Sequence, residues 1–193
     1  MSDFELLLQK GKAFHGDICP GIVLGTRMTM AGMRALGLSP LEKHHDLLVY
    51  VEIDRCAADA IQAITGCSLG HRTLKFRDYG KLAATFVNAR TGEAVRVSVI
   101  EKTDRGRDGP NVKEAMKEAV KRLSAAPEAE ILRLARVLVQ VPEEDLPGFP
   151  RSKVICSRCG EQVLDGREIV VDGRPLCKAC ASGSYYTINS ASD

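Results

Sequence analysis

The stretch Lys81-Leu-Ala-Ala-Thr-Phe-Val-Asn-Ala-Arg-Thr-Gly-Glu-Ala-Val-Arg-Val-Ser-Val-Ile100 decides the class of fold. Its two halves, 81–88 and 94–100, are rich in the β-branched and apolar residues that favour strands. The loop between them contains Gly92, which adopts a positive φ without steric cost. We therefore predict a β-hairpin and, with it, an antiparallel sheet.

Helices and further strands surround this hairpin in the sequence. Ser2 and Glu5 form a capping box that begins a first helix, which ends at Gly16. Pro20 suits the first turn of a second helix, which we expect to run to about Leu36. The same patterns predict strands at 47–53 and 73–76 and helices at 56–65, 111–124 and 128–139. The sequence thus predicts an α+β fold, with mixed helices and a largely antiparallel sheet.

The chain divides into a core and an appendage. Its 193 residues and mass of 21.0 kDa suit one domain of ordinary size plus a small module. The stretch 142–150 contains three prolines and shows no periodicity, which indicates a linker. We expect an α+β core domain at 1–141, a proline-rich linker at 142–153, a cysteine-rich module at 154–182 and a polar tail at 183–193.

Composition excludes several classes of protein. No apolar run approaches the roughly 18 residues that span a bilayer, and the acidic beginning lacks the layout of a signal peptide. A net charge of only +2 argues against binding of the whole molecule to nucleic acid or anionic lipid. We therefore expect a cytoplasmic protein. Its seven cysteines then favour metal or thiol chemistry over a disulfide framework.

Two Cys-x-x-Cys pairs, Cys156 with Cys159 and Cys177 with Cys180, lie near the end of the chain. Tetrahedral zinc takes four thiolates, and each pair can place two sulfurs on one metal. We predict a structural zinc site at these cysteines, in a small treble-clef or zinc-ribbon-like module. The alternative is a pair of redox dithiols. Because the module is too small to build its own core, the metal would supply most of its folding energy.

The charge of this finger bears on its partners. Residues 154–193 carry four Lys or Arg against five Asp or Glu. A finger that binds phosphate groups would be expected to carry a basic surface. We therefore expect the finger to support a protein contact or the structure itself, and we do not expect nucleic acid as a partner.

The other three cysteines, Cys19, Cys56 and Cys67, lie in the expected core together with His15. Cys19 directly precedes the second predicted helix and Cys56 begins the third. Because helix N-termini favour anions, we expect depressed pKa values for both thiols. A tight loop separates His15 from Cys19 and can direct two ligands at one point.

His15, Cys19 and Cys56 form a candidate mixed His/Cys metal site in the core, and Asp17, Asp59 or Cys67 is available to complete or support it. Three protein ligands would leave an open coordination position, as in catalytic or ligand-binding metal sites. Two alternatives stay open at this point. The histidine and the thiols can simply pack in the core, or Cys56 and Cys67 can form a redox pair.

Three stretches carry a resemblance to a known family: His15-Gly-Asp-Ile-Cys-Pro-Gly21, Asp54-Arg-Cys-Ala-Ala-Asp-Ala-Ile-Gln-Ala-Ile-Thr-Gly-Cys67 and Gly70-His-Arg-Thr-Leu74. They resemble the E-subunit family of formylmethanofuran dehydrogenase, some members of which carry an appended four-cysteine finger. The resemblance implies an α+β core, a homodimer, and a cavity lined by His15, Cys19, Cys56 and Cys67 that can hold a second transition metal such as zinc. It also implies association with a molybdenum or tungsten formylmethanofuran dehydrogenase, in the one-carbon metabolism of methanogenesis and related pathways.

The leading hypothesis is a metal-binding accessory protein that serves a larger redox enzyme. It would hold structural zinc in the finger and a metal or thiol site in the core. The first alternative is a metal-dependent enzyme that acts on a small molecule, with the core metal as Lewis acid and Asp17 or Asp59 handling protons. The second is a thiol-redox protein that uses Cys56 and Cys67.

Overall fold

The computed structural model describes residues 1–100 and 111–188. The chain separates into two compact units, Met1–Val141 and Pro142–Asp193, and each is described by itself. The last five residues of the expected polar tail lie outside the described residues. Among the helices of the described residues, none has the length and apolar character needed to cross a membrane.

A five-stranded sheet lies at the centre of the first unit, and its strands are β1 (Leu47–Val51), β2 (Leu74–Phe76), β3 (Ala83–Asn88), β4 (Ala94–Val99) and β5 (Leu132–Val137). The strand order is β2-β1-β3-β4-β5. The predicted hairpin is confirmed, since β3 and β4 pair in antiparallel register with Phe86 opposite Val95, and Gly92 has a φ of 75°. Among the described strands of this sheet, only β1 and β2 pair in parallel, so the predicted α+β class with a largely antiparallel sheet holds.

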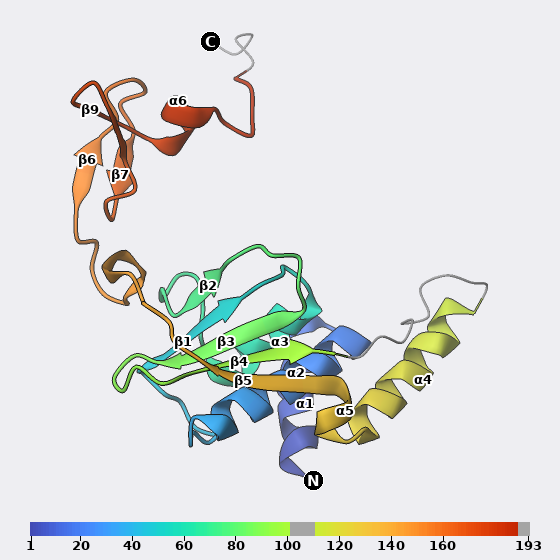
Figure 1. Cartoon of the computed structure of the whole chain (residues 1–193). Coiled ribbons are helices and arrows are strands. Elements are labelled where there is room, and N and C mark those ends of the chain that lie inside the picture. The colour runs from blue at the N-terminus through green and yellow to red at the C-terminus, as the bar shows by residue number, and fades with distance from the viewer. Residues whose placement is uncertain (101–110, 189–193) are drawn as a thin grey trace. The chain divides into compact units, whose positions relative to one another are not determined.

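The helices of this unit are α1 (Asp3–His15), α2 (Pro20–Ala35), α3 (Cys56–Thr65), α4 (Val112–Ala125) and α5 (Glu128–Ile131). Figure 1 shows α1, α2 and α3 together on one side of the sheet. Helix α2 packs against β3 and β4 and also contacts α1, α3 and α4. Its apolar residues, such as Leu24 and Met28, are buried against the sheet residues Phe86 and Val97 in one core.

Local signals set the ends of these helices as predicted. The capping box is present, because the Ser2 hydroxyl accepts from the Glu5 N–H and the Glu5 carboxylate accepts from the Ser2 N–H. Cys19 is the N-cap of α2, and Pro20 follows it at the first helical position. Gly66 ends α3 in the left-handed conformation, with a φ of 72°.

Glycines on α2 bring its backbone close to α3. A Cβ built on Gly25 would lie 2.7 Å from the Cα of Ala57 and 2.8 Å from the Cβ of Ala60, which is closer than real carbon atoms approach. One turn earlier, a Cβ on Gly21 would lie 2.9 Å from the Cβ of Cys56. The first turns of α2 and α3 therefore lie side by side, and this contact positions the core site.

The predicted helix at 128–139 is wrong beyond its first turn. Helix α5 ends at Ile131 and the chain continues as β5, which pairs with β4 through contacts such as Leu132 opposite Val99. The stretch fits a helical period, but the unpaired edge of β4 offers backbone hydrogen bonds that local propensity does not include. Arg34 of α2 forms an ion pair with Glu128 of α5 at 2.6 Å.

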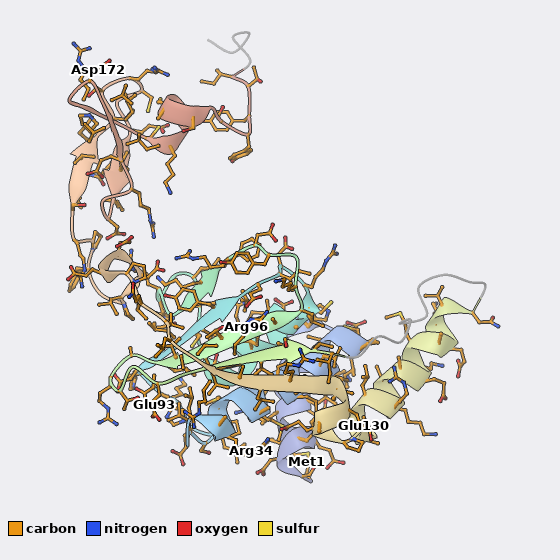
Figure 2. All side chains as sticks on the ribbon, in the orientation of Figure 1. Met1, Arg34, Glu93, Arg96, Glu130 and Asp172 are labelled. Carbon is orange, nitrogen blue, oxygen red and sulfur yellow. The ribbon has the colours of Figure 1, made fainter. Side chains whose placement is uncertain are left out.

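A charged pair crosses the sheet. The guanidinium of Arg96 on β4 donates two hydrogen bonds to the carboxylate of Glu52, at 2.6 and 2.7 Å, and Figure 2 shows Arg96 over the sheet. Only 5% of Glu52 is exposed. Because β3 lies between β1 and β4, this bidentate pair links the sheet across an intervening strand.

The second unit consists of short elements: a 3-10 turn, η1 (Glu143–Asp145), strands β6 (Lys153–Ile155), β7 (Gln162–Leu164), β8 (Ile169–Val171) and β9 (Arg174–Leu176), and helix α6 (Lys178–Ser182). The strands form two hairpins, β6–β7 and β8–β9. Asp172 and Gly173 both have a positive φ in the second hairpin's turn, as a type I′ turn requires. Two hairpins followed by a short helix form the treble-clef layout.

Candidate metal centres

The four cysteines of the second unit come together in space. Cys156 and Cys159 lie in the loop between β6 and β7, Cys177 is the N-cap of α6, and Cys180 lies in its first turn. One sulfur from each cysteine lies within 4.8 Å of the others. Cys159 Sγ and Cys177 Sγ are 3.9 Å apart, and two thiolates on tetrahedral zinc are about 3.8 Å apart.

Hydrogen bonds around the four sulfurs shift the pKa values of two of these thiols in opposite directions. Hydrogen bonds from the Cys159 and Cys177 N–H groups lower the pKa of Cys156 to about 6. The side-chain hydrogen bond with Cys177 raises the pKa of Cys180 to about 12. Four thiolates cannot share this volume without a cation, and a bound zinc ion would supply the positive charge that keeps all four ionised.

The core cluster forms where three helices meet. His15 is the last residue of α1, Cys19 is the N-cap of α2, and Cys56 is the first residue of α3. One donor atom from each lies within 4.8 Å of the other two. Cys19 Sγ lies 3.9 Å from His15 Nε2, compared with about 3.6 Å for a thiolate and an imidazole nitrogen on the same tetrahedral zinc. These donors fit one metal ion.

A carboxylate orients the imidazole of this cluster. Asp59 Oδ2 lies 2.8 Å from His15 Nδ1, and Asp59 lies one turn along α3 from Cys56. With Nδ1–H donating to Asp59, Nε2 carries the free lone pair and faces Cys19. Metal-binding histidines commonly have such an outer carboxylate. Asp17, largely exposed, lies 3.5 Å from His15 Nε2 at the edge of the cluster.

The pKa of the Cys19 thiol does not follow the sequence-based expectation. Only 7% of Cys19 is exposed, and this burial raises the pKa of its thiol. The predicted depression at Cys19 is therefore wrong: desolvation outweighs the helix N-terminus and the nearby backbone N–H groups of Ile22 and Gly21. A bound cation would be needed to hold this sulfur as a thiolate.

Cys67 lies apart from the cluster. It follows the C-cap of α3, while Cys56 begins that helix, so about 15 Å of helix separates them. Its buried thiol donates to the carbonyl oxygen of Leu47 at 3.5 Å. A disulfide needs Cα atoms within about 7 Å. The structure therefore gives Cys67 no position as a fourth ligand and no route to a redox pair with Cys56 inside one chain.

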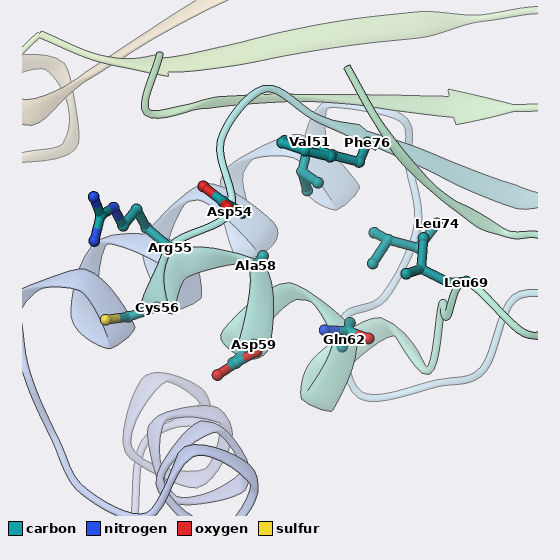
Figure 3. Close-up of a pocket in the computed structure, with 10 residues that line it drawn as sticks. All are labelled: Val51, Asp54, Arg55, Cys56, Ala58, Asp59, Gln62, Leu69, Leu74 and Phe76. Carbon is teal, nitrogen blue, oxygen red and sulfur yellow. The ribbon is translucent and has the colours of Figure 1, made fainter. Parts of the chain in front are cut away.

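Two cavities adjoin the cluster at the beginning of α3. The first, of about 320 Å³, is lined by Cys19, Cys56 and Arg55 and by the apolar residues Ile53, Leu82 and Met116. The second, of about 460 Å³, has Asp54 and Asp59 in its wall and shares Arg55 and Cys56 with the first (Figure 3). No separate role for Arg55 was predicted from the sequence, although its position directly before Cys56 was the available signal.

The first unit matches a known family. Residues 14–147 match FmdE, described as molybdenum formylmethanofuran dehydrogenase operon. The chain belongs to the FmdE family. Residues 149–186 match the prokaryotic dksA/traR C4-type zinc finger. This match and the cluster of four cysteines support zinc binding by the finger of this FmdE protein.

Two relatives extend the match over most of this FmdE protein. A solved structure of a tungsten formylmethanofuran dehydrogenase FmdE-like protein from Syntrophus aciditrophicus covers 95% of both chains, with a TM-score of 0.62 and 27% identity. A probable S-adenosyl-L-methionine-binding protein from Archaeoglobus fulgidus is 32% identical over 97% of this chain. The chain spans only 55% of that relative's length.

Proposed function

We propose that this FmdE protein is a metal-binding accessory protein with two different metal sites. The finger holds a structural zinc ion, and the core holds a second transition metal, zinc by its donor set, at His15, Cys19 and Cys56. The observation that carries the core site is the meeting of these three donors within 4.8 Å at the ends of three helices. Three protein donors leave one coordination position for a ligand.

The chemistry of the core donors supports zinc. Imidazole and thiolate are ligands that zinc accepts in tetrahedral geometry. The His15–Asp59 hydrogen bond at 2.8 Å fixes the imidazole in the orientation that a metal requires. Asp59 therefore acts as the supporting residue, and Asp17 takes an outer position at the exposed edge.

The family match supports the partner. The FmdE family is described as molybdenum formylmethanofuran dehydrogenase operon. The solved relative is named a tungsten formylmethanofuran dehydrogenase FmdE-like protein. We propose that this chain forms a homodimer and associates, as an accessory protein, with a formylmethanofuran dehydrogenase or a related redox complex. A metal-dependent enzyme that acts on a small molecule is the alternative, and the cavity beside Cys56 is what favours it.

Metal analysis of single variants tests the core site. We expect two metal equivalents per wild-type chain, and one in each of the Cys19→Ser and Cys56→Ser variants. Cys67→Ser is the matched control, because this cysteine is also buried in the core but lies outside the cluster, so it keeps both equivalents. Unchanged stoichiometry in Cys19→Ser and Cys56→Ser, in protein that folds as wild type, contradicts the core metal.

A further inference from the structure

The first cavity has features that select a ligand. Its wall contains two of the three core donors, Cys19 and Cys56, so a ligand inside it reaches the metal position directly. Ile53, Leu82 and Met116 make much of the remaining wall apolar. The volume of about 320 Å³ holds several non-hydrogen atoms, since a water molecule in the liquid occupies about 30 Å³.

Arg55 is the one charged residue among the described residues that line this cavity. Within the described part of the chain, its guanidinium forms no hydrogen bond and no ion pair. Figure 3 shows that the Arg55 and Cys56 side chains extend to the same side of the beginning of α3. The cavity thus offers an unpaired cation next to a metal-binding sulfur.

The second cavity differs in charge. Asp54 and Asp59 line it together with Arg55, and two carboxylates oppose the entry of an anion. The first cavity has no acidic residue in its described wall. An anionic ligand is therefore favoured in the first cavity.

We propose that this cavity binds a small carboxylate that carries a thiol a few atoms away. The carboxylate pairs with the Arg55 guanidinium, which matches its planar geometry. The thiol releases its proton to solvent and binds, as thiolate, at the metal position that His15, Cys19 and Cys56 leave open. This inference rests on the core metal of the proposed function.

The charges and the softness of the donors agree with this ligand. A divalent metal with two thiolates and a neutral imidazole has no net charge, so a third thiolate leaves one negative charge near Arg55. Thiolate-rich sites favour soft ligands over a second carboxylate. The apolar residues of the wall cover the carbon chain between the two ends of the ligand.

The probe is 3-mercaptopropionate, titrated into the full chain loaded with Co²⁺, whose visible absorption reports the ligands of the metal. Cobalt also fills the finger, so the Cys19→Ser variant, which keeps only the finger site, gives the background spectrum. We expect saturable binding by the wild type. Arg55→Leu should weaken it by up to about 10-fold, because Arg55 is exposed and its pair with the carboxylate stays partly solvated. Arg133→Leu, an exposed arginine on β5, is the matched control and keeps wild-type binding.

Two further probes, each lacking one end of the ligand, test what the carboxylate and the thiol contribute to binding. Propanethiol lacks the carboxylate, so it should bind more weakly and with less dependence on Arg55 than 3-mercaptopropionate. Propionate lacks the thiol and should leave the cobalt spectrum unchanged. Equal binding of 3-mercaptopropionate to wild type and Arg55→Leu, or an equal spectral change with propionate, overturns the inference. A wild-type spectrum identical to that of Cys19→Ser before any probe is added instead overturns the core metal itself.

Discussion

Asp59 Oδ2 lies 2.8 Å from His15 Nδ1, across 44 positions of the sequence, and this hydrogen bond joins the end of α1 to the first turns of α3. It selects the tautomer of the imidazole that leaves Nε2 for the metal. The two residues meet because α1 packs on α3, so the orientation of the ligand depends on the packing of two helices.

Asp59→Asn should weaken metal binding by the core about 10- to 100-fold, as loss of an outer carboxylate commonly does. An amide can still accept a hydrogen bond, but it no longer supplies the negative charge that makes the imidazole a stronger ligand. Competition with a chromophoric chelator measures the affinity. Asp17→Asn is the matched control, and it should change the affinity much less, because Asp17 is largely exposed and lies outside the group of three mutually close donors. The reverse order of the two variants would contradict the role of Asp59.

Local sequence signals were enough to predict much of this site. The capping box at Ser2, the prolyl first turn at Pro20 and the left-handed Gly66 each depend on a few neighbouring residues. Gly16, which ends α1, and Pro20, which begins α2, place His15 and Cys19 at helix ends without knowledge of the rest of the fold.

What the sequence could not predict depends on packing between distant elements. The predicted helix at 56–65 already separates Cys67 from Cys56, but the hydrogen bond of the Cys67 thiol to the Leu47 carbonyl depends on how β1 packs beside the end of α3. Residues 132–137 form β5 and pair with β4, where a helix was predicted. The sequence periodicity of this segment contains no information about β4, which is distant in the sequence. The raised pKa of Cys19 reflects burial, which is likewise a property of the whole core.

Gly25→Ala should destabilise the core by about 1–3 kcal/mol, or more if the helices cannot separate. The added methyl group would meet backbone atoms of Ala57 at 2.7 Å, and backbone cannot rotate away as a side chain can. Urea unfolding followed by helical circular dichroism measures the change. Gly70→Ala serves as the control, since a Cβ there meets nothing within 4 Å and its φ is not positive, so its effect should stay within about 0.5 kcal/mol. Equal stability of the two variants would show that α2 and α3 do not pack this closely.

The buried thiol of Cys67 predicts a loss of stability at high pH. Desolvation raises the pKa of this thiol in the folded chain, whereas an unfolded cysteine titrates near pH 8.5. Below about pH 8.5 both states keep the proton and the full stability is present. Above it the unfolded state loses its proton first, so the free energy of unfolding falls as the pH rises towards the folded pKa.

Cys67→Ala isolates this contribution. The alanine variant should be less stable at pH 7, because a buried side chain is lost, but its stability should fall less steeply than that of the wild type between pH 8 and pH 10. Urea unfolding at several pH values, followed by helical circular dichroism, gives the two slopes. Parallel slopes would mean that burial does not raise the pKa of the Cys67 thiol in the folded chain.

Removal of zinc should unfold the finger and leave the first unit folded. Among the described residues of 142–188, Cys156 and Leu176 are the only buried apolar side chains, while Ile155 and Val170 are more than half exposed. So small an apolar core cannot offset the entropy of ordering the segment, and zinc coordination must supply the difference. Hydrogen exchange read by mass spectrometry should show loss of protection in peptides from 153–182 after chelation or in Cys180→Ser, with β3 and β4 unchanged. Lys178→Ala, which lies between the two cysteines of the second pair, should retain the protection. Full protection of the finger peptides in the zinc-free chain would contradict a folding role for the metal.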